Sequence, residues 1–188
     1  MDIRTFAAIE LPQSVRQRIG SHIDQLKTAV PEANPSWSRV ENIHLTVKFF
    51  GDVEQSRIKQ ISDAAARAVT GLKPFDVLVT GTGAFPKPNQ PRVLWIGLED
   101  PSGLLSELHR RFEDECANQG FEKEGRLFRP HLTIARIRKP EGGRRLAEVN
   151  KELGFESMRL TVGELIVFRS ELSSKGSKYT ALSRHKLA

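Results

Sequence analysis

Apolar residues recur along the chain with two periods, and their alternation predicts a mixture of strands and helices. Repeats every three or four positions predict helices over roughly residues 12–30, 54–70, 102–118 and 143–153. Short β-rich runs predict eight strands. These runs are IRTFAAIEL, NIHLTVKFFG, PFDVLVTG, RVLWIGLE, FRPHLTIAR, MRLTV, ELIVFRSEL and KYTALSR. We expect Gly51 to close the second run, and TGAFPKPNQP to form a long hairpin loop.

This order of elements indicates an α+β protein. No linker rich in Pro, Gly or Ser separates independent units, so residues 1–188 are interpreted as a single domain. We expect it to be bilobal, with two pseudo-symmetric lobes that each pair a mostly antiparallel sheet with helices. A cleft between the lobes is the expected place for an active site, and it needs no second chain, so we expect a monomer.

The composition indicates in which cellular compartment the protein is expected. Apolar residues make up 38% of the chain, and no apolar run is long enough to cross a bilayer. The opening MDIRTFAAIELP has no sustained apolar segment of the kind found in secretion signals. The single cysteine, Cys116, lies on the apolar stripe of a predicted helix, which favours a packing role and a reducing, cytoplasmic location.

Charge adds a preference about partners. The chain carries 29 Lys and Arg against 23 Asp and Glu, a net charge of +6 with a sequence pI near 9.7. A surplus of basic side chains favours anionic ligands such as nucleotides or RNA, although many basic proteins bind nothing acidic in particular.

Two six-residue stretches resemble each other: HLTVKF at residues 44–49 and HLTIAR at residues 131–136. Side chains alternate between the faces of a strand, so His44, Thr46 and Lys48 are expected on one face, with the apolar residues between and after them facing the core. Each strand would therefore present a histidine beside a threonine hydroxyl on the face opposite its own core.

The second motif repeats this arrangement. The same alternation groups Arg129, His131 and Thr133, and predicts that Arg136 points to the opposite face. Arg136 would reach the shared face only if the strand ended or bulged before it. If the lobes are related by an approximate two-fold axis, the two polar faces meet across the cleft with one histidine on each wall.

Such a pair suits displacement at phosphorus. An in-line attack needs a base for the nucleophile and an acid for the leaving group, and imidazoles can hold both states near neutral pH. Threonine hydroxyls and an arginine would stabilise the phosphate oxygens. A single histidine beside a threonine in a strand is more often structural. Two such pairs favour catalysis, because a duplicated structural strand has no reason to keep both polar side chains exposed.

The H-x-T-x motifs resemble those of the 2H phosphoesterase superfamily, and their surroundings resemble its RNA 2′,3′-cyclic phosphodiesterase branch, also described as 2′-5′ RNA ligase. The similarity covers nearly the whole chain. It includes RTFAAIELP, HLTVKFFGDV, GAFPKPNQPRVLWIGLE, FRPHLTIAR and YTALSR. The resemblance implies a bilobal fold, an active site without metal or cofactor, and hydrolysis of a 2′,3′-cyclic phosphate to a 2′-phosphomonoester. In reverse, the same chemistry would join RNA ends through a 2′-5′ linkage.

By this resemblance, His44 and His131 are the catalytic pair, with His44 as the acid for the 3′ oxygen and His131 as the base for water. Thr46 and Thr133 are the implied phosphate ligands. Arg136 also matches, because members of the branch use the arginine that ends the second motif on the phosphate. The first motif ends in Lys-Phe, so a phosphate contact from Lys48 stays open.

Other residues offer weaker signals. Phe6, Phe85 and Trp37 are candidates for stacking on a base, with core packing as the alternative. Arg129, Lys87 and Arg92 are candidates for contacts with an RNA backbone. The remaining histidines are expected in packing or surface roles, within helices for His22 and His109 and in a frayed basic tail for His185. No histidine, cysteine and carboxylate cluster has the spacing of metal ligands.

Two further functions remain open at this stage. One is a cyclic phosphodiesterase that acts on small nucleotides or nucleotide sugars rather than RNA ends. The other is a non-catalytic RNA-binding module that retains the fold, against which the intact His and Thr of both motifs argue.

Overall fold

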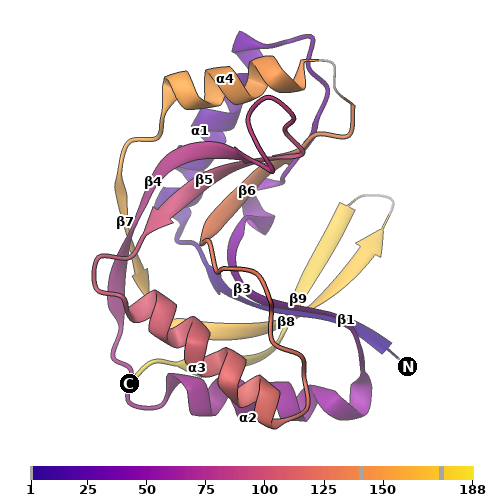
Figure 1. Cartoon of the computed structure of the whole chain (residues 1–188), viewed down its shortest axis with the longest axis vertical. Helices are drawn as coiled ribbons and strands as arrows, with labels where there is room; N and C mark the ends of the chain where they lie inside the picture. Colours follow the sequence, from indigo (N-terminus) through magenta and orange to yellow (C-terminus); the bar gives the residue numbers. More distant parts are fainter. Residues whose placement is uncertain (1, 140–141, 174–175) are drawn as a thin grey trace.

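The computed structural model describes residues 2–139, 142–173 and 176–188 and contains two lobes stacked along the long axis (Figure 1). The lower lobe in Figure 1 contains an antiparallel sheet in the order β3-β1-β8-β9. Its strands are β1 (Asp2–Glu10), β3 (His44–Glu54), β8 (Glu164–Ser173) and β9 (Gly176–Lys186). The other sheet has the order β2-β6-β5-β4-β7. Its strands are β2 (Ser36–Trp37), β4 (Phe75–Phe85), β5 (Val93–Glu99), β6 (His131–Arg136) and β7 (Met158–Val162).

Each sheet is covered by two helices. The helices α2 (Ile58–Val69) and α3 (Leu104–Asn118) pack on the four-stranded sheet, whereas α1 (Gln13–Ala29) and α4 (Gly143–Leu153) lie on the five-stranded sheet (Figure 1). The α+β, bilobal prediction is confirmed. The chain crosses between the lobes more than once, since β1 and β3 lie in one sheet and β2 and β4 in the other, so the lobes are not the two halves of the sequence. In the described ranges, no helix combines the length and apolar character needed to cross a membrane.

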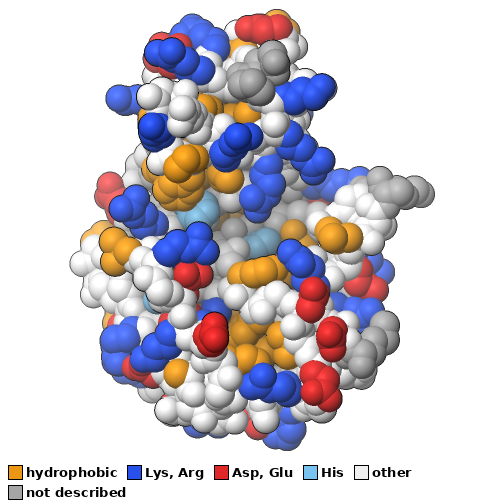
Figure 2. Space-filling model, turned by 45° about the vertical axis from the view of Figure 1, so that its right-hand side comes forward, with side chains coloured by type: hydrophobic (Ala, Val, Ile, Leu, Met, Phe, Trp, Pro, Cys, Tyr) orange, Lys and Arg blue, Asp and Glu red, His pale blue; other side chains and the backbone are white. Residues whose placement is uncertain are grey.

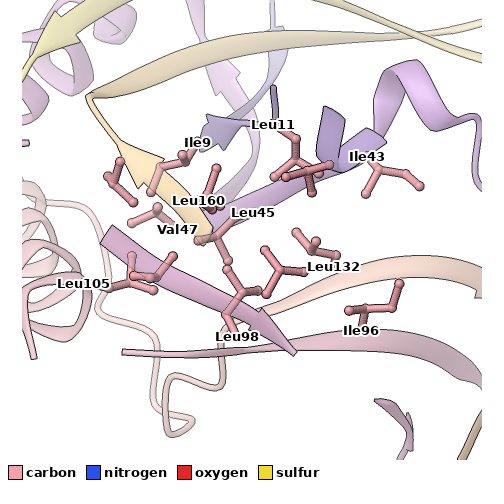
Figure 3. Close-up of a cluster of buried hydrophobic side chains, with 14 of the residues drawn as sticks. Ile9, Leu11, Ile43, Leu45, Val47, Ile96, Leu98, Leu105, Leu132 and Leu160 are labelled. Carbon is pink, nitrogen blue, oxygen red and sulfur yellow. The ribbon is translucent and has the colours of Figure 1, made fainter. Parts of the chain in front are cut away.

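The lobes share one hydrophobic core. Leu45 of β3 and Leu132 of β6, each the residue after a motif histidine, lie in the same buried cluster (Figure 3). Both side chains are completely buried, and β3 and β6 contact each other between the lobes. Because each leucine points into the core, the histidine and threonine on either side of it in the strand must face away from the core.

Several element boundaries differ from the predictions because glycines allow strands to continue through bulges. β3 runs past Gly51, which has a positive φ of 74° at a register shift against β1. The expected helix over residues 54–70 therefore begins later, at Ile58. β4 likewise continues through Gly81, with φ of 72°, into the expected loop. The two-residue strand β2 had no apolar periodicity that would predict it.

The prediction that His185 lies in a frayed tail is wrong. His185 is half-buried in β9, where it is the partner of Leu165 in β8. Its Nε2 atom lies 2.9 Å from the Ser183 hydroxyl. The next apolar residue, Leu187, is buried, and this anchors the end of the chain against the sheet.

Candidate active site

A cleft of about 480 Å³ brings the two motifs together. Its lining includes His44 and Thr46 from β3 together with His131 and Thr133 from β6. Figure 2 shows histidine side chains in the hollow between the lobes, surrounded by Lys and Arg. The four side chains that the motifs place on the strand faces opposite the core therefore share one solvent-accessible site.

The two histidines are held in the same way. The Nδ1 atom of His44 lies 2.7 Å from the carbonyl oxygen of Asn42, and that of His131 lies 2.7 Å from the carbonyl oxygen of Arg129. A carbonyl can only accept, so in each ring Nδ1–H donates and Nε2 is left as the nitrogen available to the cleft. The backbone thus selects the tautomer in which neutral Nε2 can take a proton and charged Nε2–H can give one.

Aromatic rings fix the planes of both imidazoles. Phe6 stacks on His44 with ring centroids 4.7 Å apart, and Tyr179 meets His44 edge-on at 5.3 Å. On the opposite wall, Phe85 meets His131 edge-on at 5.0 Å. Phe6 lines the cleft but is only 4% exposed, so most of its surface is already used in packing.

Burial lowers the pKa of His44 below the ordinary histidine value, because desolvation disfavours the imidazolium. The nearby positive charge of Arg16 lowers this pKa further, and the hydrogen bond to the Asn42 carbonyl acts in the opposite direction. In the absence of an anionic ligand, the neutral form of His44 is therefore favoured.

Both motif strands bulge at the third residue after the histidine. In β3, Thr46 and Lys48 pair with consecutive residues of β1, so Val47 is the extra residue. In β6, Thr133 and Ala135 pair with consecutive residues of β5, so Ile134 is the extra residue. Each bulge shifts the alternation of side chains by one position.

The bulge in β6 places Arg136 on the same side of the strand as His131 and Thr133. Strict alternation predicts Arg136 on the core side, but Ala135 is buried there and Arg136 lines the cleft. Its guanidinium joins the same wall as His131 and Thr133.

The bulge in β3 reverses the expectation for Lys48 and Phe49. Lys48 is 7% exposed, and its Nζ atom lies 2.8 Å from both carboxylate oxygens of Glu113. Phe49, expected in the core, is 54% exposed and lines the cleft. The structure therefore does not bring Lys48 to the two motif histidines, because the extra residue turns its side chain inward.

The other candidates for RNA contacts lie differently. The side chain of Arg129 is exposed and is not part of the cleft lining, although its carbonyl holds His131. Lys87 and Arg92 are exposed outside the cleft lining. Trp37 does line the cleft, and Phe85 contacts His131.

The charged side chains that line the cleft are positive. Four arginines and no carboxylate are found among the lining residues that the structure describes. The arginines are Arg4, Arg39, Arg136 and Arg138. In the described ranges none of them forms an ion pair with a carboxylate, so their charge is available to an anion. Sequence reasoning missed three of them, although Arg138 follows Arg136 and Arg4 precedes Phe6 at the two-residue spacing of one strand face.

The remaining histidines and the cysteine lie elsewhere. His22 is buried with a ring nitrogen 2.8 Å from Asn150, and His109 stacks on Phe128 at 4.0 Å. Cys116 is buried, which raises the pKa of its thiol to about 12. Within the described ranges, no three His, Cys, Asp or Glu side chains gather in a way that would hold a metal ion.

A two-lobed α+β fold with an H-x-T-x motif on each side of the cleft defines the class of two-histidine phosphoesterases. Two segments, residues 9–95 and 96–179, match the family model described as LigT like Phosphoesterase, and the chain belongs to this family. The two matches also explain the repeated motif, since each segment contains one copy of it.

Curated relatives extend over the full chain. RNA 2′,3′-cyclic phosphodiesterase of Methanothermobacter thermautotrophicus is 35% identical over 188 residues, which cover 100% of both chains. The protein of that name from Thermotoga maritima is 31% identical over 96% of this chain and 93% of its own. The crystal structure of Escherichia coli LigT complexed with NADP+ aligns with a TM-score of 0.76 at 25% identity, covering 100% of this chain and 99% of that one.

Proposed function

We propose that this chain is an RNA 2′,3′-cyclic phosphodiesterase that hydrolyses a 2′,3′-cyclic phosphate to a 2′-phosphomonoester. The observation that carries this proposal is the pairing of His44 and His131, held by identical backbone hydrogen bonds, in one arginine-lined cleft. The names of the two curated relatives, which match over nearly their whole lengths, support the same activity.

The proposed reaction is a single in-line displacement. Water attacks phosphorus as Nε2 of His131 takes one of its protons, and the bond between phosphorus and the 3′ oxygen breaks as Nε2–H of His44 protonates that oxygen. Thr46 and Thr133 donate hydrogen bonds to the non-bridging oxygens, and Arg136 stabilises their charge. The two imidazoles then exchange protons with solvent before the next turnover. This chemistry needs no metal or cofactor.

The lowered pKa of His44 bears on the proposed division of roles. In the free protein it reduces the protonated fraction that an acid needs. A bound phosphate anion beside Nε2 would raise this pKa again, because opposite charge favours the imidazolium. A substrate with sulfur in place of the 3′ bridging oxygen tests the assignment, since a thiolate leaves without a proton. We expect it to restore turnover in His44→Ala and not in His131→Ala.

The central experiment compares wild type with His44→Ala and His131→Ala on RNA that ends in a 2′,3′-cyclic phosphate, in excess chelator. We expect chelator-resistant formation of a 2′-phosphate, with each substitution lowering the rate by roughly 10² to 10⁴. Full activity in either variant, or turnover only after divalent metal is added, would contradict the proposal. Tight RNA binding without cleavage would indicate the non-catalytic module instead.

The same assay with cyclic mononucleotides and nucleotide-sugar cyclic phosphates tests the small-molecule alternative. We propose RNA ends as the principal substrate because the cleft holds more arginines than one phosphate needs. Ligation through the reverse reaction, a monomeric state and a cytoplasmic location remain parts of the proposal. Light scattering after size exclusion tests the monomer, and incubation of cyclic-phosphate ends with 5′-hydroxyl ends tests ligation.

A further inference from the structure

A close ring stack joins α3 to the segment that leads into the second motif. The imidazole of His109, on α3, lies on the ring of Phe128, with centroids 4.0 Å apart and 7° between the planes. Phe128 precedes Arg129, whose carbonyl oxygen accepts Nδ1–H of His131. We propose that the His109–Phe128 stack is a positioning element for His131, because it fixes this carbonyl and so keeps Nε2 as the nitrogen available to the cleft.

The carbonyls that hold the two motif histidines are secured differently. Asn42 ends a 3₁₀ turn, and its side-chain amide donates to the carbonyl of Ser177 at 2.8 Å. Arg129 instead lies in the irregular stretch between α3 and β6. Within the described ranges, no backbone N–H of residues 127–130 donates a hydrogen bond. The position of the Arg129 carbonyl therefore depends on side-chain packing.

Phe128 supplies this packing. The last hydrogen bond before it that reaches another element comes from the N–H of Glu124, which donates to the Glu113 carboxylate at 3.1 Å. Residues 125–127 are exposed. Phe128, by contrast, is half-buried against the hydrophobic core and is stacked on His109. It is therefore the point at which the stretch before the second motif is fixed to the lobe.

The residues after Phe128 carry its position to the carbonyl. The ring of Pro130 fixes its own φ, and it disfavours helical backbone at Arg129. Few backbone torsions are therefore free to change between the Phe128 ring and the Arg129 carbonyl oxygen. A shift of Phe128 would move this oxygen relative to Nδ1 of His131, since little else in the stretch can absorb the shift.

His109 gives the stack a rigid base. A carboxylate oxygen of Glu113, one helical turn further along α3, lies 3.8 Å from Nε2 of His109. Lys48 of β3 holds the same carboxylate, so the imidazole lies beside a fixed charge. The core-facing side of α3 is completely buried at Leu105, Leu108 and Phe112. The place of the His109 ring is therefore set by the core of the lobe.

The stack affects the chemistry through the tautomer of His131. If the Arg129 carbonyl moves away, neutral His131 can carry its proton on Nε2, where it then cannot accept one from water. This consequence rests on the proposed function, in which His131 is the base. Thr133 and Arg136 are placed by the pairing of β6 with β5, so substrate binding should not depend on the stack. Loss of the stack should therefore lower kcat and leave KM nearly unchanged.

The first test measures the tautomers of both motif histidines by heteronuclear NMR in the free protein, at a pH where imidazoles are neutral. His109→Ala and Phe128→Ala remove the stack, whereas His109→Phe keeps an aromatic ring in the same place. We expect His131 to lose its preference for Nδ1–H in both alanine variants and to keep it in His109→Phe. His44 is the internal control, because the Asn42 carbonyl that holds it is secured elsewhere.

Kinetics on adenosine 2′,3′-cyclic phosphate supply the second readout. We expect both alanine variants to lower kcat by about 10- to 10²-fold, because a small misplacement of a reacting group has an effect of this size. His109→Phe should restore most of the rate. His22→Ala is the matched control, because His22 is also a helix histidine packed against a phenylalanine, Phe155, but in the other lobe. It should leave kcat and both tautomers unchanged.

Two variants keep the test decisive if one of them does not fold. Phe128 is only half-buried and lies outside the helices and strands, so Phe128→Ala should fold even if His109→Ala does not. An unchanged His131 tautomer and an unchanged kcat in folded Phe128→Ala would overturn the proposal. So would an equal change at His44 and His131, which would indicate a general loosening of the protein.

The NMR measurement needs no turnover, so it separates this inference from the proposed function. If wild type hydrolyses no cyclic phosphate but Phe128→Ala changes the tautomer of His131 alone, the positioning role stands and the enzyme assignment fails. If wild type is active and Phe128→Ala changes neither the tautomer nor kcat, the positioning role is overturned and the enzyme assignment stands.

Discussion

Lys48 and Glu113 form a buried ion pair, with Nζ of Lys48 2.8 Å from each carboxylate oxygen. Nζ also donates to the carbonyl of Glu122, and the carboxylate accepts the backbone N–H of Glu124. The pair therefore ties β3 and α3 to the segment that leads into β6. All three protons of the ammonium have partners, so Lys48 serves the structure of the lobe rather than a phosphate.

We expect Lys48→Met to lower the free energy of unfolding by about 3–5 kcal/mol, because it leaves the Glu113 carboxylate buried and unpaired. The double variant Lys48→Met with Glu113→Leu should recover much of this loss, since neither charge remains. Denaturant unfolding of the single and double variants measures both effects. A folded Lys48→Met protein that binds phosphate poorly but unfolds at the wild-type denaturant concentration would restore the phosphate role.

The proposed phosphate ligands are best tested by substitutions that preserve the volume or the charge of the side chain. Thr46→Val and Thr133→Val remove a hydroxyl donor at nearly constant volume, and we expect each to lower kcat by roughly 10- to 10³-fold. Arg136→Lys keeps the charge but loses the bidentate geometry, so it should also be impaired. Arg129→Lys is the control, because the side chain of Arg129 is exposed outside the cleft lining. Wild-type kinetics in both valine variants would exclude the threonines as phosphate ligands.

The lowered pKa of His44 predicts how the protonation of its ring and kcat/KM change with pH. Burial and the charge of Arg16 lower this pKa, so NMR titration of the free protein should find the His44 ring neutral until the pH falls below the ordinary histidine value. Arg16→Gln removes a positive charge and should raise the pKa, but only partly, because desolvation is the larger cause. With His44 as the acid, kcat/KM falls as pH rises through this pKa. A His44 pKa above the ordinary value would contradict the burial argument.

Much of this fold could be predicted because its signals are local. Apolar periodicity identifies the four helices, and alternation on the motif strands places His44 and His131 on the strand faces opposite the core. What alternation cannot show is an extra residue in the ladder. The bulges at Val47 and Ile134 depend on the partner strands β1 and β5, so the positions of Lys48, Phe49 and Arg136 could not be derived from one strand alone.

The lining of the cleft also could be predicted only in part from local sequence patterns. The motifs predict four of its polar side chains, but Arg4 and Tyr179 come from β1 and β9, which are distant from both motifs in sequence. The chain crosses between the two sheets more than once, so strands far apart in the sequence pair side by side, an arrangement that no local pattern encodes. The prediction of a frayed tail at His185 is wrong for a related reason. His185 is held in a strand by its pairing with β8, and the basic sequence around it does not indicate this pairing.

If RNA ends are the substrate, the arginines beyond Arg136 should make binding of RNA more dependent on salt than binding of a cyclic mononucleotide. Arg39 and Arg138 line the cleft without carboxylate partners in the described ranges, so they are available to phosphates upstream of the reacting one. Each such contact with a single strand should contribute about 0.7 to the slope of log affinity against log salt concentration. We expect Arg138→Gln to lower this slope by about that amount for a five-nucleotide RNA and to leave it unchanged for a cyclic mononucleotide. KM measured from low to physiological salt supplies both slopes, with Lys87→Gln as a control for an exposed charge outside the cleft lining. Equal slopes for the two substrates in wild type would mean that only the reacting phosphate is bound, and the small-nucleotide function would then replace the RNA one.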